Sequence, residues 1–146
     1  MLFKNLLLVV TFWLLVLAPR MAFPQGNALG ATLAQLEKAY RANPEAYNWK
    51  FNAAPGPQDL PYVTFRSRAS PLSTFAYYLE NGRVRRYTIA EPAAYAAYWR
   101  RRLDKEAKRE EIPPVVVWFD KRQQCYWSVD VVQDYVLVTA NPLPAE

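Results

Sequence analysis

The sequence of 146 residues contains no histidine and a single cysteine, Cys125. Without histidine, this chain alone cannot form a Ser/His/Asp triad, a Cys/His dyad or a histidine-ligated metal site. One cysteine also excludes an intramolecular disulfide and a cysteine-ligated zinc cluster. We therefore expect a protein without catalytic activity that binds neither a metal nor a cofactor.

Glycine is scarce, with 4 residues, whereas the 12 prolines lie mostly where one segment gives way to the next. This distribution is typical of short elements joined by stiff connections. Apolar residues make up 52% of the chain and aromatic residues 15%, which is enough for a packed core. The length predicts one domain, residues 24–146, behind a separate N-terminal segment, residues 1–23.

The N-terminal segment has Lys4 near its start and an apolar run from Leu6 to Ala18, broken only by Thr11. A run of this length is typical of a signal peptide and is short of the roughly 20 residues that cross a bilayer. The segment is therefore read as a cleaved signal or as an uncleaved anchor, and in the second case only residues 1–18 meet the membrane. A helix buried in the core is the third alternative. Because the sequence has no Asn-x-Ser/Thr glycosylation site, we favour a bacterial periplasm over a eukaryotic secretory route.

Alternating and periodic patterns predict the secondary structure of the domain. Apolar residues spaced three and four apart predict a helix from Leu29 to Tyr40, and a second helix is predicted from Glu91 to about Glu110. Residues 62–68 and 75–89 predict strands, and residues 113–140 predict three more, with Cys125, Trp127 and Val129 facing the core.

These elements predict an α+β fold: a helix, β-hairpin strands, a second helix and a three-stranded antiparallel sheet, behind the apolar export or anchor segment. The order also permits two similar helix-plus-hairpin halves, residues 28–90 and 91–146.

The strongest local signal is Asn81-Gly82 between two β-rich runs, the favoured two-residue hairpin turn. A regular register from this turn would place Glu80 opposite Arg83 and Tyr78 opposite Arg85. One face of the hairpin would then carry the four candidate partner-binding residues: Tyr78, Arg83, Arg85 and Tyr87. Arginine beside tyrosine is a frequent composition of binding surfaces, although the same pattern also describes an ordinary solvated sheet face.

Charge is distributed unevenly along the domain. Residues 62–90 hold five arginines against one glutamate, a balance of +4, while residues 112–146 have a balance of −2. A basic face of this kind predicts a protein partner with an acidic surface. The run Arg100-Arg101-Arg102 does not indicate nucleic-acid binding, because five acidic residues accompany the six basic ones in residues 91–111.

Carboxylates are the remaining candidates for catalysis: Glu91, Asp120, Asp130 and Asp134. A hydrolase would need two of them close together, and Asp120 with Asp130 is the pair that a hairpin could bring together. Cys125 has no histidine to activate it, so we interpret it as a buried core residue.

The sequence thus predicts an exported, non-catalytic protein-binding domain, such as a periplasmic inhibitor or immunity-type protein. Two alternatives stay open. One is a subunit of a secretion or conjugation assembly that is anchored in the inner membrane. The other is a small carboxylate-based hydrolase.

Overall fold

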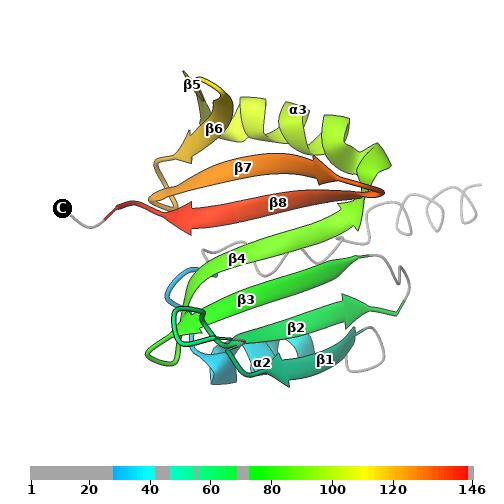
Figure 1. Ribbon diagram of the computed structural model, residues 1–146, viewed down its shortest axis with the longest axis vertical. Coiled ribbons are helices and arrows are strands. Elements are labelled where there is room, and N and C mark those ends of the chain that lie inside the picture. Colours follow the sequence, from blue (N-terminus) through cyan, green and yellow to red (C-terminus); the bar gives the residue numbers. More distant parts are fainter. Residues whose placement is uncertain (1–27, 42–46, 55, 69–72, 145–146) are drawn as a thin grey trace, which may run out of the picture.

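The computed structural model describes residues 28–41, 47–54, 56–68 and 73–144. Its dominant feature is one eight-stranded antiparallel sheet with the strand order β1-β2-β3-β4-β8-β7-β6-β5 (Figure 1). The strands are β1 (Tyr47–Asn52), β2 (Tyr62–Ser67), β3 (Thr74–Glu80), β4 (Arg83–Pro92), β5 (Lys108–Ile112), β6 (Val115–Asp120), β7 (Cys125–Val132) and β8 (Tyr135–Pro142). The helical elements are α2 (Leu33–Arg41), α3 (Ala96–Glu106) and the short 3-10 helix η1 (Ala93–Tyr95).

This architecture corrects the predicted fold class. The strands do not form a hairpin and a separate three-stranded sheet, because β4 pairs with β8 and joins all eight strands into one layer. Within the described residues the order of a helix followed by four consecutively paired strands occurs twice. The pairing of β4 with β8 links residues about 50 positions apart, such as Thr88 and Thr139. A local sequence pattern cannot predict a contact over this separation.

The predicted N-terminal segment, residues 1–23, lies outside the described part of the chain. In the ranges that are described, no helix is long and apolar enough to cross a membrane.

The first helix begins later than its apolar spacing predicted. Thr32 and Gln35 form a capping box, in which the Thr32 backbone N–H donates to Gln35 Oε1 (2.8 Å) and the Gln35 backbone N–H donates to Thr32 Oγ1 (3.3 Å). Leu36 and Tyr40, four residues apart, are buried on the sheet side, as the periodic pattern predicted. Tyr40 stacks on Phe65 of β2, with ring centroids 3.9 Å apart.

The second helix is shorter than predicted, because Lys108 to Ile112 form the edge strand β5. Ion pairs between residues two apart, Lys108 with Glu110 (3.3 Å) and Arg109 with Glu111 (3.0 Å), suit a strand, in which such residues lie on the same face. Asp104 does not pair with Lys108 as a longer helix would require, and instead accepts a hydrogen bond from Trp118 Nε1 (2.8 Å).

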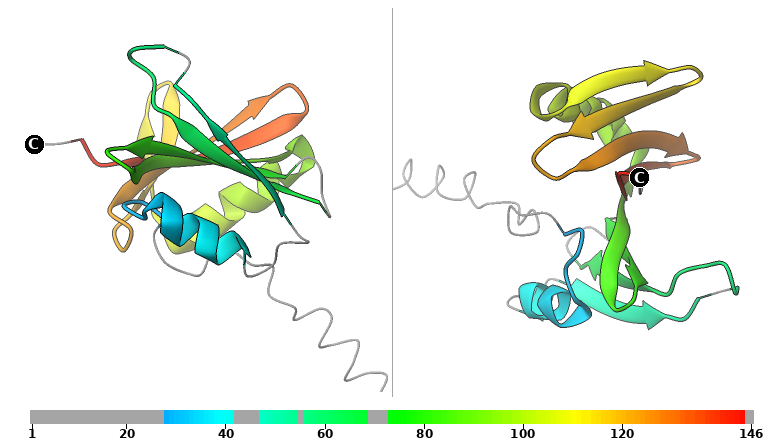
Figure 2. Two further views of the ribbon diagram at one scale, coloured as in Figure 1. Left: turned by 90° about the horizontal axis from the view of Figure 1, so that it is seen from below. Right: turned by 90° about the vertical axis from the view of Figure 1, so that its left-hand side faces the viewer.

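Helices α2 and α3 lie on the same face of the sheet, and no helix of the described residues lies over the opposite face, which we call the helix-free face (Figure 2). One side-chain row of the sheet shows where the core sits. Strand pairing aligns it as Trp118, Trp127, Ala140, Tyr87, Tyr77 and Val63, all of which are buried. Residues next to this row along each strand must point to the helix-free face, because side chains alternate.

The Asn81-Gly82 turn forms as predicted, with both residues at positive φ, 51° and 74°. Glu80 pairs with Arg83 and Leu79 with Val84, but a β-bulge follows, so that Tyr78 pairs with Arg86 and not with Arg85. The extra residue reverses the faces of all later positions in β4 relative to a regular hairpin.

Candidate interaction surface

A continuous row of large side chains crosses the helix-free face. Phe119 pairs with Tyr126, Tyr126 with Asn141, Arg86 with Tyr78, and Tyr78 with Tyr62. The two halves of this series meet between β8 and β4. There the pairing of Tyr87 with Ala140 places Arg86 beside Asn141. We call this set the aromatic row: Phe119, Tyr126, Asn141, Arg86, Tyr78 and Tyr62.

Side chains of the aromatic row are in contact at both of its ends. The Arg86 guanidinium lies over the Tyr78 ring, 4.4 Å from its centroid, and the Tyr62 and Tyr78 centroids are 5.3 Å apart. On the far side, the Phe119 and Tyr126 centroids are also 5.3 Å apart. The rings are half-buried by these contacts, so their orientations are restricted before any partner arrives.

The next row on the same face consists of small side chains: Thr64, Ala76, Thr88, Thr139 and Ser128. The hydroxyl groups of Thr88 and Thr139 are 3.1 Å apart and hydrogen-bonded to each other across the centre of the sheet. The large side chains of the aromatic row stand higher above the sheet than the short side chains of this second row. This relief is a basis for shape-specific docking.

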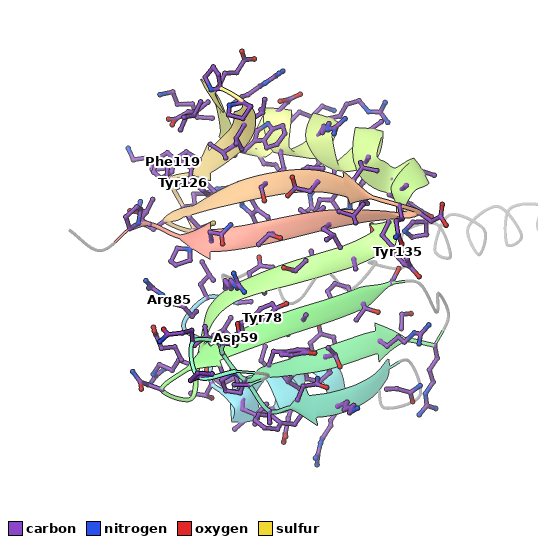
Figure 3. The ribbon with its side chains drawn as sticks, viewed as in Figure 1. Asp59, Tyr78, Arg85, Phe119, Tyr126 and Tyr135 are labelled. Atoms are coloured by element: carbon purple, nitrogen blue, oxygen red, sulfur yellow. The ribbon has the colours of Figure 1, made fainter. Side chains whose placement is uncertain are left out.

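A hollow of about 370 Å³ lies beside Arg86, near the middle of the aromatic row. It is lined by Gln58, Asp59, Leu60, Glu80, Arg85, Arg86 and Pro142. Arg85 is in an ion pair with Glu80 at 3.5 Å, and Figure 3 labels Asp59 and Arg85, which line this hollow. Among the residues that the structure describes, Arg86 forms no ion pair, so its charge is available to a group outside the chain.

The structure separates the four residues predicted to share one face. Tyr78 belongs to the aromatic row and Arg85 lines the hollow beside it. Arg83 is at the hairpin tip, where its Nη1 donates to the Gly30 carbonyl oxygen at 3.0 Å. Tyr87 lies on the opposite, helix-covered face and is only 8% exposed.

The bulge after Val84 explains why the prediction put Tyr87 on the wrong face of the sheet. It turns Tyr87 toward the core, where its ring centroid is 5.5 Å from those of Tyr77 and Trp127. Arg86, which a regular hairpin would point inward, takes the outward position instead. The sequence contained one signal for this, since Val84 and Tyr87 are the apolar positions of this segment and are spaced three apart rather than two.

The predicted carboxylate pair is not brought together. Asp120 pairs with Cys125 at the start of β7, and Asp130 is five residues further along that strand, about 17 Å away. Glycosidase-type pairs need a separation of roughly 5–10 Å. Asp120 is 5% exposed and accepts hydrogen bonds from the backbone N–H groups of Arg122 (2.9 Å) and Gln123 (3.1 Å), which gives it a structural role in the β6–β7 turn.

Cys125 is fully buried, as its place in the alternating pattern predicted. Burial, with a smaller contribution from the nearby Asp120, raises the pKa of its thiol to about 12. Burial also raises the pKa of the Tyr87 hydroxyl above its ordinary range. Both groups are therefore neutral in the folded protein at neutral pH.

We expect the Cys125 thiol of the folded protein to resist alkylation by iodoacetamide at neutral pH and to react once the chain is unfolded. The neutral thiol also stabilises the fold fully below its unfolded pKa, about 9, and this contribution is lost as the pH rises toward about 12. Denaturant titrations across that range should show a falling free energy of unfolding. Rapid alkylation of the native protein would contradict the buried position.

The helix-free face thus carries an aromatic and cationic row with a hollow beside Arg86, and the predicted Asp120/Asp130 pair does not form. No known family model matches the chain, and comparisons with curated proteins and with solved structures find no significant match.

Proposed function

We propose that this protein is an exported, non-catalytic protein-binding domain whose helix-free sheet face holds an acidic surface of a partner protein. The observation that carries the proposal is the aromatic row, whose aligned positions extend over six neighbouring strands. Tyrosine and arginine lose little entropy on binding and recur among the residues that dominate interface energies.

Charge supports an acidic partner. Glu80 is the only acidic residue in residues 62–90, and its carboxylate is already in an ion pair with Arg85. Arg86 therefore presents a guanidinium that is fixed against Tyr78 and can bind a carboxylate with two parallel hydrogen bonds. In an envelope setting, the corresponding role is that of a periplasmic inhibitor or immunity-type protein that holds a toxin or hydrolase.

The test is a Tyr78→Ala/Arg86→Ala variant, with the tagged wild type used to capture and identify the partner from the envelope fraction of the native host. Each truncated hot-spot side chain costs about 2 kcal/mol, so we expect binding to weaken by about 100-fold or more. Rising ionic strength should weaken the wild-type complex as well, since exposed charges are screened.

A matched control removes one exposed aromatic ring and one exposed cation elsewhere, Phe51→Ala/Lys38→Ala, and should bind like the wild type. Thermal melts of both variants verify that they fold. Wild-type affinity in the Tyr78→Ala/Arg86→Ala variant would show that the aromatic row is an ordinary solvated face. The identity of the partner separates an inhibitor role from that of an assembly subunit.

A further inference from the structure

The solvent-facing sides of the two helices carry exposed cations. Helices α2 and α3 together contain six basic residues against three acidic ones, a balance of +3. We call four of the exposed cations, with one tyrosine, the cationic helix surface: Lys38 on α2, and Tyr98, Arg100, Arg101 and Lys105 on α3. Both helices project from the same side of the sheet (Figure 2), so an extended flat partner can contact both of them.

The three carboxylates of these helices already have partners inside the chain. Glu37 and Glu106 each form an ion pair with an arginine four residues away in the same helix, at 3.6 and 3.1 Å. Asp104 accepts the 2.8 Å hydrogen bond from Trp118 Nε1. Among the described residues, none of the four cations of the cationic helix surface forms an ion pair. Their charge is therefore available to anionic groups outside the chain.

The outer side of α3 combines this charge with an aromatic ring. Tyr98, Arg101 and Lys105 are spaced three and four residues apart, so they lie along one side of the helix, away from the buried Leu103. The Tyr98 side chain is 40% exposed, and its ring packs edge-on against Trp99 with centroids 5.8 Å apart. Tyrosine and long basic side chains suit the headgroup region of a bilayer, because ring and methylene groups contact lipid while the polar tips stay in water.

We propose that the cationic helix surface docks on the anionic headgroups of a lipid bilayer. The apolar run Leu6–Ala18 favours a membrane over other polyanions. Ala28, the first described residue, follows Ala18 by ten positions, so the linking chain spans at most about 35 Å. A run that stays in the bilayer therefore keeps α2 and α3 near the lipid surface. At the resulting high effective concentration, a few cations are enough for docking.

Docking through the helices leaves the helix-free face accessible, since the aromatic row lies on the opposite side of the sheet (Figure 2). The inference uses the anchored form of the chain and does not depend on which partner that face binds. The two surfaces share no residue. The Tyr78→Ala/Arg86→Ala variant should therefore dock on lipid like the wild type even when it loses its partner, so that each proposal can fail without the other.

The test measures which side of the domain faces the lipid. The complete sequence is reconstituted with phosphatidylcholine vesicles, with or without phosphatidylglycerol, that contain a lipid with a nitroxide quencher on its headgroup. A fluorophore is attached through Ala97→Cys on the exposed side of α3, or through Asp130→Cys, which is exposed on the helix-free face. Cys125 is fully buried and stays unlabelled. We expect phosphatidylglycerol to increase quenching at the Ala97 position and to leave the Asp130 position nearly unchanged.

Charge variants test the named cations. Arg101→Gln/Lys105→Gln should lower the docking equilibrium on phosphatidylglycerol vesicles about 30-fold, since each cation near an anionic surface contributes roughly fivefold. The matched control Lys50→Gln/Arg66→Gln removes two cations from the helix-free face and should dock like the wild type. High ionic strength should release the wild-type domain from the lipid, because the charges are then screened. Circular dichroism verifies that every variant folds.

The proposal is wrong if phosphatidylglycerol quenches the two labelled positions equally, because the domain then has no preferred side toward the lipid. Quenching at the Ala97 position that is the same without phosphatidylglycerol would show that charge does not drive the contact. Docking that Arg101→Gln/Lys105→Gln does not weaken would place the contact on another surface. Binding of a DNA duplex without any response to phosphatidylglycerol would assign the cationic helix surface to nucleic acid.

Discussion

Deleting Thr88 is expected to lower the free energy of unfolding by more than about 5 kcal/mol, which equals the whole stability of a marginally stable domain. Deleting Arg85, three positions earlier in the same strand, is expected to change it by no more than about 1 kcal/mol. The difference arises because Arg85 is the extra residue of the β-bulge, whereas Thr88 lies in the regular ladder between β3 and β8.

Without Arg85, the sequence Val84-Arg86-Tyr87 alternates inward, outward and inward, so every later side chain keeps its face. The variant loses mainly the ion pair with Glu80, whose two side chains are 45% and 52% exposed, and a pair this exposed contributes little. Without Thr88, two rearrangements are possible. In the first, Ile89 and the rest of β4 turn outward. In the second, the bulge disappears, so that Arg86 points into the core and Tyr87 points to solvent. Both arrangements expose a large buried side chain, and the second also buries an unpaired charge.

Chemical denaturation followed by tryptophan fluorescence measures both deletions against the wild type. A Thr88 deletion as stable as the Arg85 deletion would show that β4 can shift its register freely, and would contradict the assigned faces of Arg86 and Tyr87. The Arg85 deletion also serves as the control for shortening the strand by one residue.

Replacing Phe65 with alanine is expected to cost about 4 kcal/mol, the second largest effect. Phe65 is 1% exposed and lies between α2 and the sheet, stacked on Tyr40 at 3.9 Å and edge-on to Tyr77 at 5.9 Å. Truncating a buried phenylalanine loses both transfer free energy and packing around the resulting cavity. It also loosens Tyr40, whose hydroxyl is hydrogen-bonded to that of Tyr77 at 2.7 Å.

Phe51→Ala on the neighbouring edge strand is the matched control, because that ring is 48% exposed and its loss should cost less than about 1 kcal/mol. Thermal and denaturant unfolding of the two variants under identical conditions gives the comparison. Equal losses would mean that the two rings contribute alike, and that α2 does not dock on β2 in the way described.

Local patterns in the sequence determined much of this protein. The four-residue spacing of Leu36 and Tyr40 identified the buried side of α2, and Asn81-Gly82 fixed the hairpin turn. The alternation of Cys125 and Trp127 identified the inward face of β7. Each of these features depends on residues within a few positions of one another, so the chain itself carries the information.

The tertiary structure decided the features on which the functional proposals depend. The aromatic row exists because β4 pairs with β8, and because the bulge exchanges Tyr87 for Arg86 on the helix-free face. Strand β5 forms because Val115–Phe119 offers an edge to residues 108–112, which would otherwise continue the helix. Local propensity by itself could not predict the β4–β8 pairing, the bulge or strand β5. The free energy that favours them comes from burying one sheet face beneath two helices. That burial exists only once distant segments have come together.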